Sequence, residues 1–192
     1  GCSLIYLLDA APALMSAALQ GLAGTGPHPS ETLAEAAADA LVELFASGNT
    51  SLAPTNEKAS QCTVLVSEQL SALAGALRIS EAVQAEGGLL EERQYHFCRV
   101  LCAFAERAVD VIAQTDGRLL PFVQLMFATL GGELRAAELT IDFWITLQDT
   151  PLAQRHEQLR VPLYRELQSR IMAKCMLPRS FTTWEDEDDL DQ

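Results

Sequence analysis

The sequence has few aromatic residues and few basic ones. Aromatic residues make up 6% of the 192 residues, whereas Ala and Leu are abundant. This composition favours closely packed helices over a β-sandwich, whose strands are rich in aromatic and β-branched residues. Lys and Arg number 13 against 26 Asp and Glu, which gives a formal net charge of −13. Such a balance repels phosphate backbones and attracts basic protein segments, so it predicts no direct nucleic-acid ligand.

The chain also lacks closely spaced cysteine pairs and a long uninterrupted apolar run. Its five cysteines are Cys2, Cys62, Cys98, Cys102 and Cys175. An odd number without close pairs indicates reduced, buried thiols, as in cytosolic or nuclear proteins, rather than a disulfide framework. The apolar start of the chain is short and is interrupted by Asp9 and Pro12. It has neither the basic start of a signal peptide nor the roughly 20 residues of a membrane helix, so we expect no membrane insertion.

Motifs that would indicate catalysis, a metal or a nucleotide are absent from the sequence. There is no G-x-S-x-G elbow, no G-x-x-x-x-G-K-[ST] loop and no G-x-G-x-x-G loop. A zinc site at His96, Cys98 and Cys102 is disfavoured, because on a helix His96 points about 200° away from Cys98. We therefore predict that both cysteines pack in the core, and that the protein is not an enzyme and has no metal or cofactor.

Helical periodicity dominates the chain, with glycine and proline turns between the periodic segments. The spacing of apolar residues predicts helices over residues 12–22, 30–44, 62–77, 89–114, 120–130, 133–148 and 151–177. Residues 78–84 continue the third helix or form a short one, and Pro162 marks a break or a restart of the last helix near Arg160. Spans of about 40 residues thus hold a helix pair, the length of HEAT and armadillo units. We expect an all-α fold, an α-α superhelix (a HEAT/armadillo-type solenoid) of about four antiparallel pairs, although a closed helical bundle stays an alternative.

Residues 133–148 are expected to organise the rest of the fold. An apolar stripe at steps of three and four is formed by Leu134, Ala137, Ile141, Trp144 and Ile145. Thr140, Phe143 and Leu147 widen this stripe beyond what a surface helix needs. The helix therefore requires neighbours on more than one side, which favours the solenoid over the closed bundle.

Four segments bear on the family of the protein: residues 35–44 (EAAADALVEL), 97–106 (FCRVLCAFAE), 143–149 (FWITLQD) and 184–189 (WEDEDD). Together they resemble segments of the karyopherin-β (importin-β superfamily) nuclear transport receptors, closest to the transportin-SR and importin-thirteen branch. The resemblance implies HEAT repeats from the middle of a longer import receptor. Such a receptor shuttles between cytoplasm and nucleus, binds protein cargo, and releases it when the GTP-bound small GTPase Ran binds. No Ran-binding residue is carried over from the family.

The C-terminal residues are expected to differ from the rest. We divide the chain into a HEAT-repeat segment at residues 1–177 and an acidic tail or inter-repeat loop at 178–192. The tail holds the predicted protein-binding residues Trp184, Glu185, Asp186, Glu187, Asp188, Asp189 and Asp191. Their carboxylates would attract a basic partner segment, with the indole stacking on arginine. A solvated linker is the alternative for the tail, and a constitutive scaffold unrelated to transport is the alternative for the whole protein.

Overall fold

The computed structural model describes residues 12–25, 28–46, 57–85, 87–114 and 117–176. All regular secondary structure in these residues is helical, so the all-α prediction is confirmed. The helices are α2 (Pro12–Ala23), α3 (Glu31–Ala46), α4 (Glu57–Ala76), α5 (Ile79–Gln84), α6 (Glu92–Arg107), α7 (Val109–Gln114), α8 (Leu120–Gly131), α9 (Leu134–Glu138), α10 (Ile141–Asp149), the 3-10 helix η1 (Glu157–Leu159) and α11 (Val161–Cys175). The predicted boundary between residues 177 and 178 lies outside the described residues.

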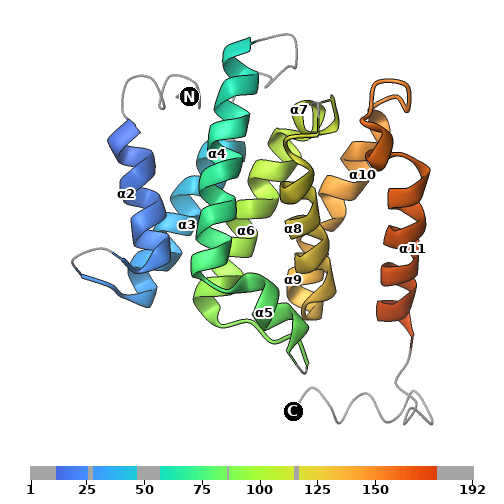
Figure 1. Cartoon of the computed structure of the whole chain (residues 1–192). Coiled ribbons are helices and arrows are strands. Elements are labelled where there is room, and N and C mark those ends of the chain that lie inside the picture. Colours follow the sequence, from blue (N-terminus) through green and yellow to red (C-terminus); the bar gives the residue numbers. More distant parts are fainter. Residues whose placement is uncertain (1–11, 26–27, 47–56, 86, 115–116, 177–192) are drawn as a thin grey trace.

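The helices form two rows (Figure 1). Helices α2, α4, α8 and α11 follow one another in a front row, and α3, α6 and the α9–α10 pair follow one another behind it. Back-row helices run parallel to each other, because Arg93 at the start of α6 pairs with Glu31 at the start of α3 while Phe104 and Phe45 meet near their ends. The chain therefore runs one way in the front row and the opposite way in the back row. Within the described residues, α11 is not followed by a back-row helix.

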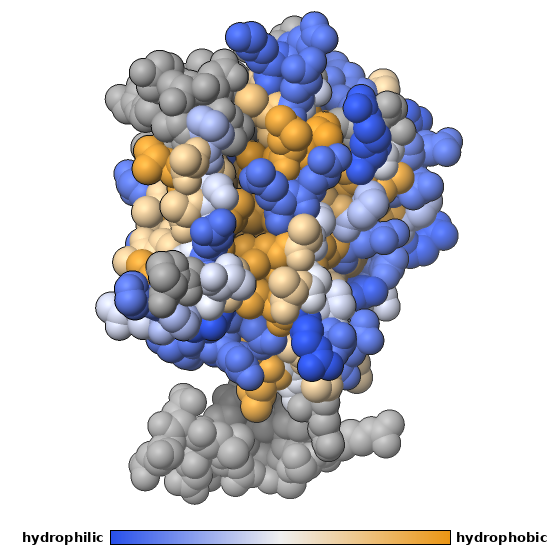
Figure 2. All heavy atoms as spheres, turned by 60° about the vertical axis from the view of Figure 1, so that its left-hand side comes forward, coloured by the Kyte–Doolittle hydropathy of each residue, from blue (hydrophilic) through white to orange (hydrophobic). Residues whose placement is uncertain are grey.

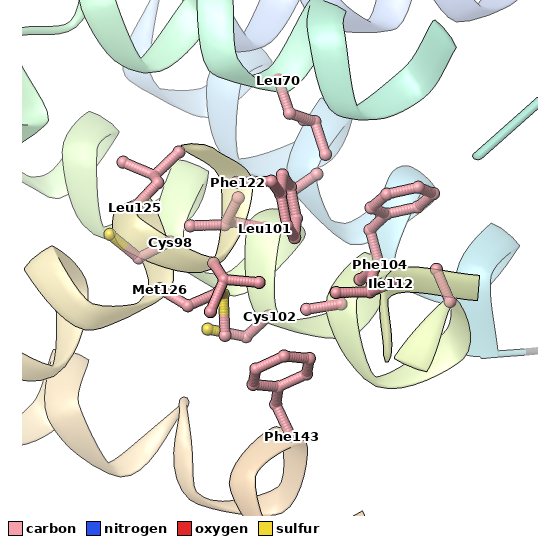
Figure 3. Packing of buried hydrophobic residues seen from close by; sticks show 14 of the residues in the cluster. Leu70, Cys98, Leu101, Cys102, Phe104, Ile112, Phe122, Leu125, Met126 and Phe143 are labelled. Carbon is pink, nitrogen blue, oxygen red and sulfur yellow. The ribbon is translucent and has the colours of Figure 1, made fainter. Parts of the chain in front are cut away.

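Helix α6 lies at the centre of the core. It contacts α2, α3, α7, α8, α9 and α10. The ring of Phe104 packs edge-on against Phe45 of α3 and Phe122 of α8, with centroids 5.2 and 5.8 Å apart. Figure 3 shows the sulfur atoms of Cys98 and Cys102 among these apolar side chains. The prediction that residues 133–148 organise the fold was therefore wrong, since that place belongs to α6.

Residues 133–148 are two helices rather than one, and their buried face differs from the predicted stripe. Leu134 and Ile145, expected inside, are 65% and 56% exposed. Ala137 and Trp144 of the predicted stripe are buried as expected, and so are Phe143 and Leu147, which were expected to widen it. The pair has the expected neighbours on more than one side, since α9 contacts α6 and α8 and α10 contacts α6 and α7. The Trp144 ring also lies 4.6 Å from that of Phe127 on α8.

Other helix boundaries also moved. The single helix expected over residues 89–114 begins at Glu92 and divides at Ala108 into α6 and α7. Its start is fixed by a capping box, in which the backbone N–H of Glu91 donates to Gln94 Oε1 at 2.9 Å. The last helix begins at Val161, at the restart expected near Arg160, and not at Pro151. Buried Arg155 donates to the carbonyls of Gln148 and Thr150 at the end of α10. This holds the chain in a non-helical turn.

Two glycine turns, at Gly87-Gly88 and Gly131-Gly132, meet at one end of the rows. The backbone N–H of Glu133 donates to the carbonyl of Gly88 at 3.1 Å. Gly88 has a φ of +59°, which an L side chain rarely adopts. A Cβ on Gly132 would lie 3.0 Å from Val83 Cγ1. Glycine at both positions thus permits close contact between the turns that join successive helices.

Candidate functional site

A groove of about 450 Å³ opens on the back row, between α3, α6 and the α9–α10 pair. Its walls carry small or apolar side chains from all three helices: Val42, Ala46, Cys102, Ala103 and Leu139. Its rim carries an aromatic residue and charged residues: Tyr95, Arg99, Glu106, Arg135, Glu138 and Asp142. On α6 these residues recur at steps of three and four, so one face of the central helix forms the floor of the groove.

The basic side of the rim is held rigidly. Arg135 donates to Glu133 Oε1 at 2.7 Å, to Glu92 Oε1 at 2.9 Å and to the carbonyl of Leu90 at 3.1 Å. The hydrogen bonds to the two carboxylates raise the pKa of Arg135, and its guanidinium lies 4.4 Å from the centre of the Tyr95 ring. This arginine is already neutralised by two carboxylates, so it supplies shape and an aromatic platform rather than an anion site.

Arg99 is engaged in a similar way. Its Nη2 donates to Asp39 Oδ1 of α3 at 2.7 Å. Together with the Arg93–Glu31 and Arg135–Glu92 pairs, this contact joins each back-row helix to the preceding one by an arginine and a carboxylate. Exposed pairs of this kind contribute little stability individually, but they fix which charges remain available in the groove.

The acidic side of the rim is not neutralised. Within the described residues, no cation pairs with Glu106, Glu138 or Asp142. Burial raises the pKa of Glu106, and the negative charge of Asp142 on α10 raises it further. A carboxylate that is half-buried beside another carboxylate gains stability from a cation brought by a binding partner. The groove can therefore receive a basic side chain next to an apolar wall.

The remaining reactive groups are placed for packing. Burial raises the pKa of Cys98 to about 12 and that of Cys102 well above its ordinary value. Neither thiol ionises at neutral pH, and both lie in the core as predicted. Within the described residues, no group of three His, Cys, Asp or Glu side chains is arranged to hold a metal ion. His156 caps η1 by accepting from the backbone N–H of Gln158.

None of the groove residues is among the predicted protein-binding residues. Trp184 and the acidic residues from Glu185 to Asp191 lie outside the described residues, and their role stays a prediction. The groove residues were missed, although a signal for them exists in the sequence. Tyr95, Arg99 and Glu106 share one face of α6, and a helix that is otherwise buried has little reason to carry polar residues there.

Comparison with protein-family models, with curated proteins and with solved structures finds no match. In the part of the chain that the structure describes, no helix has the length and apolar character needed to span a membrane. The function must therefore be inferred from the two rows and the groove.

Proposed function

We propose that this chain is a segment of a HEAT-type α-solenoid that binds protein partners and has no catalytic site. The observation that carries the proposal is the order of the helices. Front-row helices contact their front-row neighbours, and back-row helices contact theirs, with the two rows running in opposite directions. A closed four-helix bundle has no such progression, whereas stacking of successive helix pairs is the defining feature of a solenoid.

The back-row groove is the proposed binding surface. It combines apolar walls from three helices with unpaired carboxylates at Glu106, Glu138 and Asp142. A partner segment with a Lys or Arg next to a small apolar residue satisfies both features. The net charge of −13 favours the approach of the same class of partner over longer distances.

Binding to a basic peptide tests the groove directly. The double variant Glu106→Gln and Asp142→Asn should weaken binding and reduce its dependence on salt, because two charges that face the ligand are lost. The matched control neutralises Glu57 and Glu68, which are exposed on front-row α4, and should leave affinity nearly unchanged. Equal losses in both double variants would mean that only net charge matters. Neutralising the six acidic residues between Glu185 and Asp191 measures the contribution of the tail separately.

We further propose that the solenoid belongs to a nuclear import receptor that shuttles between cytoplasm and nucleus. This step is supported by the likeness of four segments to the importin-β superfamily and by a groove suited to basic cargo. In this proposal the receptor binds cargo in the cytoplasm and releases it when Ran-GTP binds in the nucleus.

Nucleotide-dependent binding separates the receptor from its alternative, a scaffold of a constitutive complex. Binding of the full-length protein to Ran loaded with GTP and with GDP should be measured with a basic cargo present. A transport receptor prefers the GTP form and releases cargo when it binds. Equal or absent binding to both forms would leave the solenoid standing and favour the scaffold.

A further inference from the structure

Two carboxylates on the acidic side of the back-row groove lie at opposite ends of their helices. Glu106 is half-buried in the last turn of α6, where the helix dipole disfavours a negative charge. Asp142 is exposed in the first turn of α10, where the dipole favours one. Both residues line the groove. A proton taken up on this side of the groove therefore goes to Glu106 rather than to Asp142.

The surroundings of Glu106 add no compensating positive charge. Arg99 and Arg135, on the other side of the groove, are each paired with a carboxylate of a neighbouring back-row helix. Burial raises the pKa of Glu106, and the charge of Asp142 raises it further. The remaining titratable groups of the lining are Tyr95 and Cys102 of α6 and Glu138 of α9, and α3 contributes only Val42 and Ala46. In the empty groove, Glu106 thus holds its proton to a higher pH than an exposed glutamate does.

We infer that the groove exchanges a proton for the basic side chain of its partner, and that Glu106 releases the proton. This inference rests on the proposed binding of a basic segment in the groove. The positive charge of the incoming Lys or Arg stabilises the ionised carboxylate, and the carboxyl group of Glu106 gives its proton to the solvent. One positive charge enters the groove and one leaves it. The half-buried side chain is therefore neutral when empty and paired when occupied, so an isolated buried charge is avoided in both states.

Acid should release the partner. The pKa of Glu106 is raised in the empty groove, and a bound cation lowers it again. Between these two pKa values the occupied groove holds fewer protons than the empty one, so affinity rises with pH, by at most about tenfold per pH unit for one proton. Above the pKa of the empty groove, Glu106 is ionised with or without the partner. The dependence on pH through this residue then disappears.

A lysine–alanine peptide with blocked ends is a suitable probe. Lysine stays charged from acid to neutral pH, so protons released in this range come from the protein. Figure 2 shows hydrophobic patches among hydrophilic residues at the α2 end of the rows, where Leu14 is 61% exposed. A more apolar peptide can bind to such patches, whereas a peptide of lysine and alanine is directed to carboxylates.

Titration calorimetry in buffers of different ionisation enthalpy counts the protons that binding releases. The unaltered protein should release up to about one proton per peptide at mildly acid pH and none near neutrality. Glu106→Gln should abolish this release and bind with an affinity that no longer changes with pH. The matched control is Glu138→Gln on the same side of the groove, which should weaken binding but keep the release. Equal release by Glu106→Gln and the unaltered protein overturns the inference.

The same experiment separates this inference from the proposed function. Binding with constant affinity and no proton release, from mildly acid to neutral pH, would keep the groove as a binding site and overturn the proton exchange. Absence of binding at every pH would overturn both.

Carbon-13 NMR of labelled glutamate observes the proton directly. The carboxyl signal of Glu106, assigned by its loss in Glu106→Gln, should titrate at a lower pH when the peptide is bound. Titration at the same pH in the free and bound protein contradicts the inference.

Discussion

Replacing Gly88 by Ala should destabilise the protein, whereas replacing Gly75 by Ala should stabilise it. At Gly88 the φ of +59° costs an alanine about 1–2 kcal/mol. The added Cβ would also lie 3.3 Å from the carbonyl oxygen of Val83 and 3.4 Å from the backbone of Gly132. We expect a total loss of about 1–3 kcal/mol. At Gly75, in the last turn of α4, nothing lies within 4 Å of the added Cβ, and alanine should gain about 0.5–1 kcal/mol.

Urea denaturation followed by circular dichroism measures both effects as shifts of the midpoint at an unchanged slope. Gly88→Asn separates the two causes of the loss, because asparagine tolerates the left-handed region better than alanine but adds the same Cβ. It should therefore unfold between the unaltered protein and Gly88→Ala. If Gly88→Ala and Gly75→Ala shifted the midpoint in the same direction by the same amount, the close contact of the two glycine turns would not contribute to stability.

Three further outcomes follow from the core and the groove. Phe104→Ala should lower the free energy of unfolding by about 3–5 kcal/mol, measured by the same denaturation, because it empties the centre of the core. Glu106→Gln should raise stability at neutral pH, since the pKa of Glu106 is raised in the folded state and its ionisation there opposes folding. This gain should disappear as the pH falls through the folded-state pKa of Glu106, and a gain that persisted in acid would contradict the assignment. Iodoacetamide should alkylate Cys175 in the native protein at pH 7.5 and spare Cys98 and Cys102 until urea is added, as read by peptide mass spectrometry.

Part of the proposed binding surface could be predicted from the sequence, and part could not. The excess of acidic residues and the preference for basic partners follow from composition alone. The acidic run from Glu185 to Asp191 could be recognised in the sequence because its charges are close together in the chain. Glu106 and Asp142 are 36 positions apart and carry no such signal. Only the packing of α10 against α6 brings the two carboxylates to one rim, where the charge of Asp142 adds to the effect of burial in raising the pKa of Glu106.

The sequence by itself determined the helical class, the places where most helices end, and the burial of Cys98 and Cys102. These properties are local, because periodicity, proline and glycine act within a few residues. The tertiary structure decided that α6 is the central helix, that Leu134 and Ile145 face outward, and that Arg155 holds the chain out of a helix. Periodicity reports how wide an apolar face is, but the neighbour that covers each part of it lies far away in the chain, so only packing assigns it.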